Sequence, residues 1–181
     1  MNAAPRSDDD GLNLDELRLV PSDPAWPEKY QKECDRLSSI PHVIAVEHIG
    51  STVFPDIQSK PVIDIAVLVD TQPDHPLVRK SFAHLGYSHH GEYGLPGRIF
   101  YTYGEPPKFH VHVVTCGSTY WADWLTFRDF LLHHPEWRKQ YEQVKLRIFD
   151  DCHGDRHTYT EMKSPFIMHV LHTSRSPSNH E

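Results

Sequence analysis

The sequence predicts an α/β protein in which a small mixed β-sheet is flanked by helices and followed by a helical C-terminal part. Residues 62–69 form an apolar run of strand length that is interrupted at Asp64. Residues 109–115 (FHVHVVT) alternate with the period of two that is typical of a strand. From Trp121 onward, aromatic and aliphatic residues recur at helical spacing. Strands therefore dominate the middle of the chain and helices its last third.

Composition limits the classes of function. A chain of 181 residues with 38% hydrophobic residues is long enough to bury the core of one soluble domain. It has no apolar run near the roughly 18 residues of a membrane span and no signal peptide, so we expect a cytoplasmic protein without membrane contact. The net charge of −7 argues against general nucleic-acid binding. Cys34, Cys116 and Cys152 form no CxxC pair and are expected to be free thiols.

The chain divides into three expected parts. Residues 1–14 are polar and acidic and predict a disordered leader, residues 15–173 form a single domain, and residues 174–181 form a flexible tail. Within the domain, two segments precede the αβ core: a short strand over 19–23 and a helix over 25–39 that Pro27 opens.

The remaining elements follow from hydrophobic periodicity and from turn residues. A helix over 77–85 ends at Gly86, and a strand over 98–103 leads into the GEPPK turn before the alternating strand. Helices are expected at 121–134, 135–149 and 158–172, the first ending at Pro135.

The stretch EHIGSTVFPDIQSKPVIDIAVLVD (residues 47–70) has the layout of a phosphate-handling site. The turn at Gly50, Ser51 and Thr52 exposes backbone N–H groups, and Lys60 provides a cation. Asp64 interrupts an otherwise apolar strand, and an unpaired carboxylate there would cost several kcal/mol. Asp64 is therefore expected to meet a metal, a cation or hydrogen-bond donors.

Histidines provide the second set of candidates. His48 adjoins an apolar run, and the period of two places His110 and His112 on one face of their strand, with origins roughly 7 Å apart. One interpretation is a metal site or an acid/base pair beside Asp64. The other is an edge strand with a polar outer face.

Three further side chains are candidates for ligand contact. Arg98 begins an aromatic-rich strand, although such strands more often belong to the core. Tyr159 and Lys163 lie four residues apart and therefore share one helical face. All three are predicted to bind substrate or phosphate.

Four separated motifs, HIGSTVFPDIQSKPVIDI, HVHVV, LTFRDFLLHHPEWRKQYEQVK and YTEMKSPFI, resemble the GrpB family, whose fold belongs to the nucleotidyltransferase superfamily. The resemblance covers about residues 17–172. It implies a nucleotide-binding type of cleft at the Gly50-Ser51 turn and Asp64.

The sequence departs from the pattern that this superfamily implies. Classical members follow Gly-Ser with two carboxylates separated by one residue, and a later strand adds a third, to hold two magnesium ions. Here Ile65 and Ala66 follow Asp64, and the later strand offers His110 or His112. Asp64, His110 and His112 could hold at most one divalent metal (magnesium, manganese or zinc), with an Asp/His set suiting zinc or manganese better than magnesium.

Three functions remain open. The first is a divergent transferase that moves a nucleotidyl or phosphoryl group to a small molecule, with Ser51 and Lys60 on the phosphate. The second is an enzyme of small-molecule metabolism in which His48, His110 or His112 with Asp64 catalyses a cyclisation, dehydration, condensation or hydrolysis. The third is a non-catalytic nucleotide- or anion-binding module. The aromatic-rich helices are a candidate surface for a homodimer.

Overall fold

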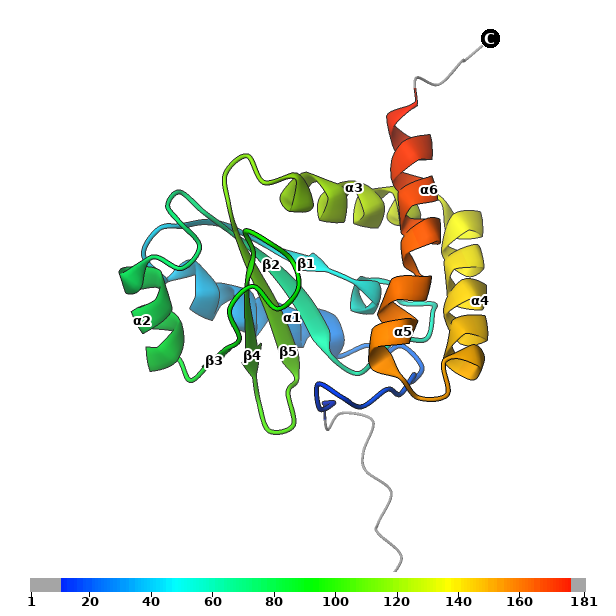
Figure 1. The fold of residues 1–181 in the computed structure, drawn as a ribbon, viewed down its shortest axis with the longest axis horizontal. Helices are drawn as coiled ribbons and strands as arrows, with labels where there is room; N and C mark the ends of the chain where they lie inside the picture. The colour runs from blue at the N-terminus through cyan, green and yellow to red at the C-terminus, as the bar shows by residue number, and fades with distance from the viewer. Residues whose placement is uncertain (1–10, 177–181) are drawn as a thin grey trace, which may run out of the picture.

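A computed structural model describes residues 11–176, which form a five-stranded mixed sheet with helices on both sides (Figure 1). The strand order is β1-β2-β5-β4-β3, in which β2 and β5 are parallel and the other neighbouring pairs are antiparallel. The strands are β1 (Val43–Ile49), β2 (Ile63–Val69), β3 (Ser88–His89), β4 (Ile99–Tyr103) and β5 (Phe109–Thr115). The predicted mixed α/β fold is confirmed.

The register of β2 and β5 gives the sheet one apolar and one polar face. Ile65 pairs with Val111, and both belong to the main core. Asp64 pairs with His110 on the other face, because successive side chains in a strand point to opposite sides. Phe109, Val111 and Val113 share the apolar face and the main core cluster.

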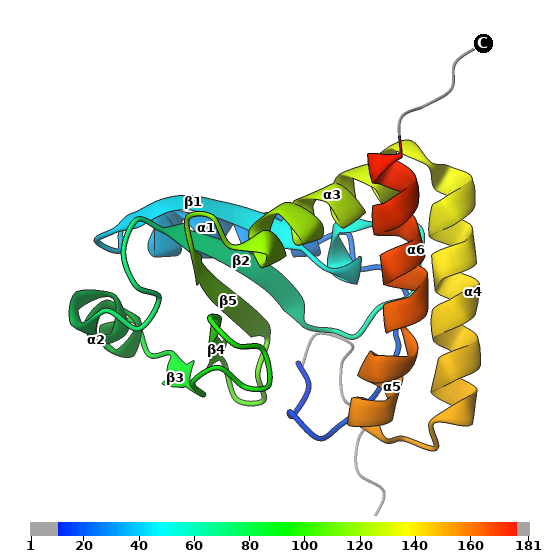
Figure 2. The ribbon, with the colours of Figure 1, turned by 45° about the horizontal axis from the view of Figure 1, so that its top comes forward.

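Two groups of helices enclose this sheet. Helices α1 (Trp26–Ser38) and α2 (Pro76–His84) pack on the apolar face, where Leu37, Val78 and Phe82 are fully buried. The C-terminal helices gather at the β1–β2 side and form a second core around Phe54 and Leu131 (Figure 2). These helices are α3 (Thr119–His133), α4 (Pro135–Asp151), α5 (Arg156–Met162) and α6 (Ser164–Arg175).

Two predicted elements differ from the structure. The expected strand at 19–23 is a single bridge between Val20 and Ser59, since Pro21 and Pro24 remove backbone donors from this segment. The expected helix at 158–172 is two helices, α5 and α6. A new helix begins at Ser164 because Pro165 fits only the first turn of a helix, and the chain breaks before it.

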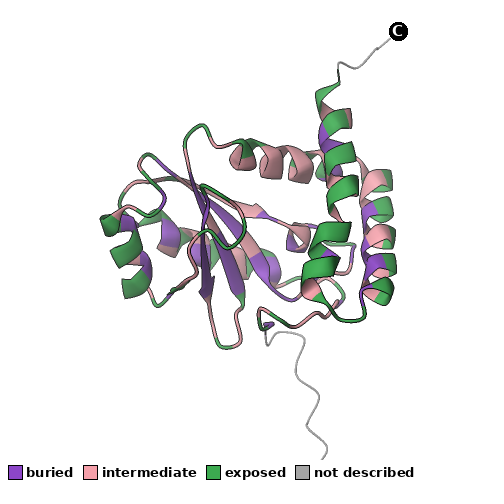
Figure 3. Cartoon of the chain, viewed as in Figure 1, coloured by how far each residue is buried: buried purple, intermediate pink, exposed green. Residues whose placement is uncertain are grey.

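The predicted leader (residues 1–14) and tail (residues 174–181) are described only in part. Residues 1–10 of the expected leader and residues 177–181 of the expected tail lie outside the described residues. Gly11 and Leu12 are buried, and the Leu12 N–H donates to the Pro107 carbonyl at 2.9 Å. Helix α6 continues to Arg175. Buried residues concentrate in the sheet and on the inner helix faces (Figure 3). Within residues 11–176, no helix combines the length and the apolar character of a membrane span.

Candidate functional site

The turn after β1 lies directly against Asp64. Gly50 has φ of +73°, and a Cβ atom added there would lie 2.6 Å from Asp64 Oδ2. Only glycine satisfies both this backbone conformation and this close approach. A short 3₁₀ turn, η1 (Ser51–Val53), follows and leads into the loop before β2. The predicted turn therefore brings its backbone and Ser51 to the strand carboxylate.

His48 does not join the other predicted histidines. It pairs with Ile65 in β1–β2 and so shares the apolar face of the sheet, where its ring stacks on Tyr30 of α1 with centroids 4.6 Å apart. Its Nε2 lies 2.9 Å from Thr52 Oγ1, so a hydrogen bond from His48 supports the η1 turn. Burial lowers its pKa to about 4, which leaves a neutral imidazole near neutral pH.

His110 and His112 both face Asp64. The Nδ1 atom of His110 lies 3.3 Å and the Nε2 atom of His112 lies 3.5 Å from Asp64 Oδ1. Their strand, β5, lies between β2 and β4, so the alternative of an edge strand with a polar outer face is wrong. The imidazoles, with Lys60, hold the pKa of Asp64 well below its ordinary value in spite of burial.

Arg98 determines the tautomer of His112. Its Nη1 lies 3.0 Å from His112 Nδ1, and a guanidinium group can only donate hydrogen bonds. The Nδ1 atom must therefore be the unprotonated nitrogen, and the proton of the neutral ring lies on Nε2, which faces Asp64. Burial lowers the pKa of His112, and Arg98 adds to this effect. Arg98 itself is buried, and it positions His112 but does not line the cavity beside Asp64.

A small, partly open cavity of about 80 Å³ lies beside Asp64. Such a volume admits several water molecules or a small anion, since about 10–15 Å³ suffices for one water. Lys60 from the loop before β2, Lys145 from α4 and Lys163 between α5 and α6 line it. We call this cavity the lysine pocket. Asp64 is the only carboxylate among the described residues that line it.

The electrostatics of the lysine pocket favour a bound anion. Burial lowers the pKa of Lys60 to about 8 and that of Lys145 and Lys163 to about 7, and repulsion from neighbouring cations adds to the effect. Lys145 also donates to the carbonyl of Gln58. One carboxylate does not balance the three ammonium groups when all are protonated, so an anion would restore their ordinary charge.

The predicted residues of the C-terminal helices reach this pocket, together with a residue pair that the sequence analysis missed. Tyr159 and Lys163 both line it, with Lys163 Nζ 4.5 Å from the centre of the Tyr159 ring. Tyr141 and Lys145 of α4 also line it. A signal existed, because Lys145 lies on the buried stripe of α4 that Tyr141 and Ile148 define.

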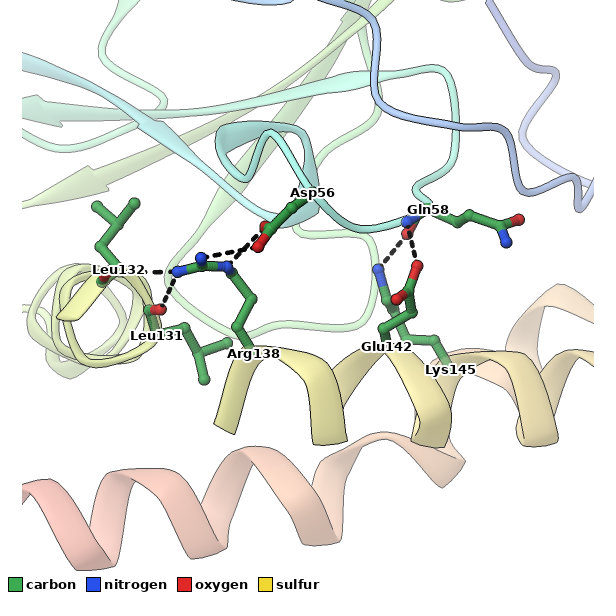
Figure 4. A network of polar contacts seen from close by, with 7 residues as sticks. All are labelled: Asp56, Gln58, Leu131, Leu132, Arg138, Glu142 and Lys145. Carbon is green, nitrogen blue, oxygen red and sulfur yellow. Dashed lines mark hydrogen bonds and ion pairs between the residues drawn. The ribbon is translucent and has the colours of Figure 1, made fainter. Parts of the chain in front are cut away.

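A polar clamp between α4 and the loop at Asp56 and Gln58 (Figure 4) precedes Ser59 and Lys60, which line the pocket. Arg138 of α4 binds Asp56 through two contacts, Nε–Oδ1 at 2.7 Å and Nη2–Oδ2 at 2.8 Å. The Gln58 N–H donates to Glu142 Oε1 at 2.7 Å, and Lys145 binds the Gln58 carbonyl. Helix α4 thus holds the loop between η1 and β2 while it places Lys145 in the pocket.

The expected metal ligands do not fit a divalent ion. The protonated Nε2 of His112 faces Asp64, because Arg98 occupies Nδ1. The Nδ1 of His110 faces the same oxygen of Asp64, and Lys60 and Lys163 add positive charge beside this carboxylate. Among the described residues, no group of three or more His, Cys, Asp or Glu side chains is arranged to hold a metal. The hydrogen-bond donors and ammonium groups around Asp64 therefore suit a bound anion better than a metal cation.

Comparison with known proteins assigns the family. The model of the GrpB protein family matches residues 16–173. The chain belongs to the GrpB family. The Glutamate-rich protein GrpB of Alkalihalophilus pseudofirmus is 30% identical over 169 residues, which cover 89% of this chain and 97% of that protein. The crystal structure of GrpB from Enterococcus faecalis superimposes with a TM-score of 0.77 at 30% identity and covers 87% of this chain and 96% of that one.

A relative with an activity in its name is more distant. The dephospho-CoA kinase of Mycolicibacterium paratuberculosis is 28% identical to this GrpB-family chain over 179 residues. The match covers 83% of this chain but 44% of that enzyme. The GxxxxGK[ST] motif that cradles nucleotide phosphates in many kinases does not occur in the sequence.

Proposed function

We propose that this GrpB-family chain binds the phosphate group of a small molecule or nucleotide in the lysine pocket and transfers a phosphoryl or nucleotidyl group to a second small molecule. One observation carries the proposal: Lys60, Lys145 and Lys163 converge on a cavity whose described lining includes one carboxylate, Asp64. Ammonium groups with little water around them bind phosphate oxygens through short, charge-assisted hydrogen bonds.

Charge stabilisation is the main demand of phosphoryl transfer, because the transferring group carries its negative charge on several oxygens. In the classical superfamily pattern two magnesium ions meet this demand. Here the lysine pocket supplies positive charge at the same edge of β2, and the Ser51 side chain adds a donor. The proposal therefore assigns to the lysines the part that metal ions take elsewhere.

Asp64 is proposed to orient the acceptor. Its lowered pKa keeps it ionised, so it accepts a hydrogen bond from an incoming hydroxyl or amine. The acceptor atom forms a bond to phosphorus while the phosphorus–oxygen bond to the leaving group breaks, and the acceptor's proton passes to solvent. From a nucleoside triphosphate, the leaving group is the nucleoside diphosphate in phosphoryl transfer and pyrophosphate in nucleotidyl transfer. His110 and His112 fix the carboxylate from the side of the sheet. Histidine-led acid/base chemistry is supported less, because a pKa of about 4 makes His110 a weak base near neutral pH.

The dephospho-CoA kinase among the relatives is compatible with a phosphate-bearing ligand. Because this chain lacks the GxxxxGK[ST] motif and covers less than half of that enzyme, the kinase reaction itself is not proposed here. A non-catalytic phosphate-binding module is the second candidate. The lysine pocket supports both, and turnover separates them.

The test is to incubate the protein with ATP, CTP, GTP or UTP and a panel of small alcohols, amines and phosphate esters in the presence of a chelator, with products followed by mass spectrometry. We expect turnover without added metal, lowered at least about 100-fold in Asp64→Asn and Lys163→Met. Lys80→Met, which changes an exposed lysine on α2, serves as the matched control. Full activity in Asp64→Asn contradicts the transferase proposed here, and turnover that requires magnesium contradicts the assignment of the metal ions' part to the lysines. Phosphate binding without turnover supports the module.

A further inference from the structure

Tyr93 is a strained and exposed aromatic residue close to the site. Its φ is +44°, a conformation that is uncommon for bulky residues and costs free energy. Its exposed fraction is 54%, and its ring stacks on Phe100 of β4 with centroids 5.0 Å apart. Strain of this kind gathers at ligand-binding segments, and here it holds an aromatic ring at the surface.

The loop that carries Tyr93 is tied to the site through Arg98. The Nη2 of Arg98 donates to the carbonyls of Glu92 and Tyr93, each at 2.7 Å, and the Nη1 of the same group faces His112. The Gly97 N–H closes the loop on Glu92 Oε1 at 2.6 Å. This loop, between β3 and β4, lies on the side of the sheet toward α5 (Figures 1 and 2). One guanidinium group therefore fixes both Tyr93 and His112.

Aromatic rings continue from Tyr93 across the polar face of the sheet to α3. The centroid distances are 5.3 Å from Phe100 to His112, 5.4 Å from His112 to Trp124 and 5.8 Å from Trp124 to Tyr120. Trp124 and Tyr120 are half-buried. We call this row the aromatic strip. It meets the lysine pocket at Asp64, which lines the pocket and lies 3.5 Å from His112.

We propose that the aromatic strip binds a planar heteroaromatic ring of the same ligand whose phosphate occupies the lysine pocket. This inference rests on the proposed function and names its substrate class as nucleotides rather than sugar phosphates. Rings stack on aromatic side chains whatever their hydrogen-bonding pattern, and such stacking is worth roughly 5- to 150-fold in affinity per base. Arg98 and Arg156 lie within electrostatic range of both Asp64 and Tyr93 and keep this region cationic, which suits an anionic nucleotide.

The test compares three kinds of ligand by calorimetric titration in a chelator: inorganic phosphate, ribose 5-phosphate and the four nucleoside 5′-monophosphates. In the unchanged protein we expect at least one monophosphate to bind about tenfold more tightly than ribose 5-phosphate. Tyr93→Ala should remove most of this advantage and leave ribose 5-phosphate affinity within about twofold. Tyr93→Phe should retain the advantage, since it keeps the ring. Leu77→Ala, at a residue 52% exposed on α2, is the surface control.

Two results would overturn the assignment of the aromatic strip and leave the phosphate-binding pocket intact. In the first, ribose 5-phosphate binds as tightly as all four nucleoside monophosphates. In the second, the monophosphates still bind more tightly than ribose 5-phosphate in both Tyr93→Ala and Trp124→Leu. Failure of the proposed function looks different. In that case neither inorganic phosphate nor ribose 5-phosphate binds, and both the phosphate-binding role of the lysine pocket and the assignment of the aromatic strip are contradicted.

Discussion

At the residue scale, Gly50 allows the turn after β1 to adopt its conformation and to approach the carboxylate of Asp64 closely. An alanine there would adopt φ of +73° with ψ of −170°, a region that is essentially restricted to glycine and costs other residues about 1–3 kcal/mol, and would also press its Cβ against Asp64. We expect Gly50→Ala to lower the free energy of unfolding by about 2–4 kcal/mol in urea titrations. Gly117→Ala is the matched control, because Gly117 has φ of +85° and nothing within 4 Å of an added Cβ. It should cost about 1 kcal/mol; equal losses would show that the contact with Asp64 is unimportant.

The tautomer of His112 is a second prediction for a single residue. Arg98→Met keeps much of the apolar stem but removes the donor to Nδ1. The pKa of His112 should then rise toward its ordinary value, since Arg98 is one cause that lowers it. Long-range ¹H–¹⁵N NMR reads both the tautomer and the pKa. His110, whose pKa is lowered first by burial and also depends on Asp64, Lys60 and Arg156, is the internal control; parallel changes in both rings would indicate general loosening.

The sequence pattern predicts several residues of the candidate site but not all of them. Asp64, His110 and His112 could be grouped from strand periodicity, because the period of two fixes which side chains share a face. His48 could not be assigned a face, since that depends on its pairing with Ile65, a long-range contact. Lys145 could have been found from its place on the apolar stripe of α4.

At the scale of elements, the clamp between α4 and the loop before β2 is the main support of the pocket. Asp56 and Arg138 form a bidentate pair, so Asp56→Ala should cost about 1 kcal/mol of unfolding free energy. Hydrogen exchange should accelerate in residues 55–60 and stay unchanged in β5. Glu28→Ala, which breaks an exposed pair with Lys32, is the control and should leave the unfolding free energy nearly unchanged. Unchanged exchange in the loop would mean that the clamp does not hold it.

The elements themselves followed from local signals where those signals were strong. The strands β2 and β5 and the helices α3 and α4 lie close to the predicted ranges because their periodicity is clear and Pro135 marks the start of α4. The single predicted helix at 158–172 is wrong because Pro165 marks the start of a new helix, α6. Even so, Tyr159 and Lys163 share the pocket, since the break comes after both.

At the scale of the whole molecule, the buried lysines make stability depend on pH. The folded-state pKa of Lys145 and Lys163 is about 7, below the ordinary value of 10.5, so the unfolded chain binds more protons above that pH. Stability should therefore rise as pH increases from about 7 to 9. We expect urea midpoints to show this rise, and Lys145→Met to flatten it while Lys80→Met does not. A slope unchanged in Lys145→Met would contradict the burial of its charge.

The central claim is that the lysine pocket binds phosphate through its own cations. The most direct measurement is a calorimetric titration of inorganic phosphate at pH 7 in a chelator, on the unchanged protein, Lys163→Met and Lys80→Met. We expect phosphate to bind with uptake of protons by Lys145 and Lys163, with affinity lowered at least about tenfold in Lys163→Met and unchanged in Lys80→Met. Absence of binding, or equal binding by all three proteins, would contradict it.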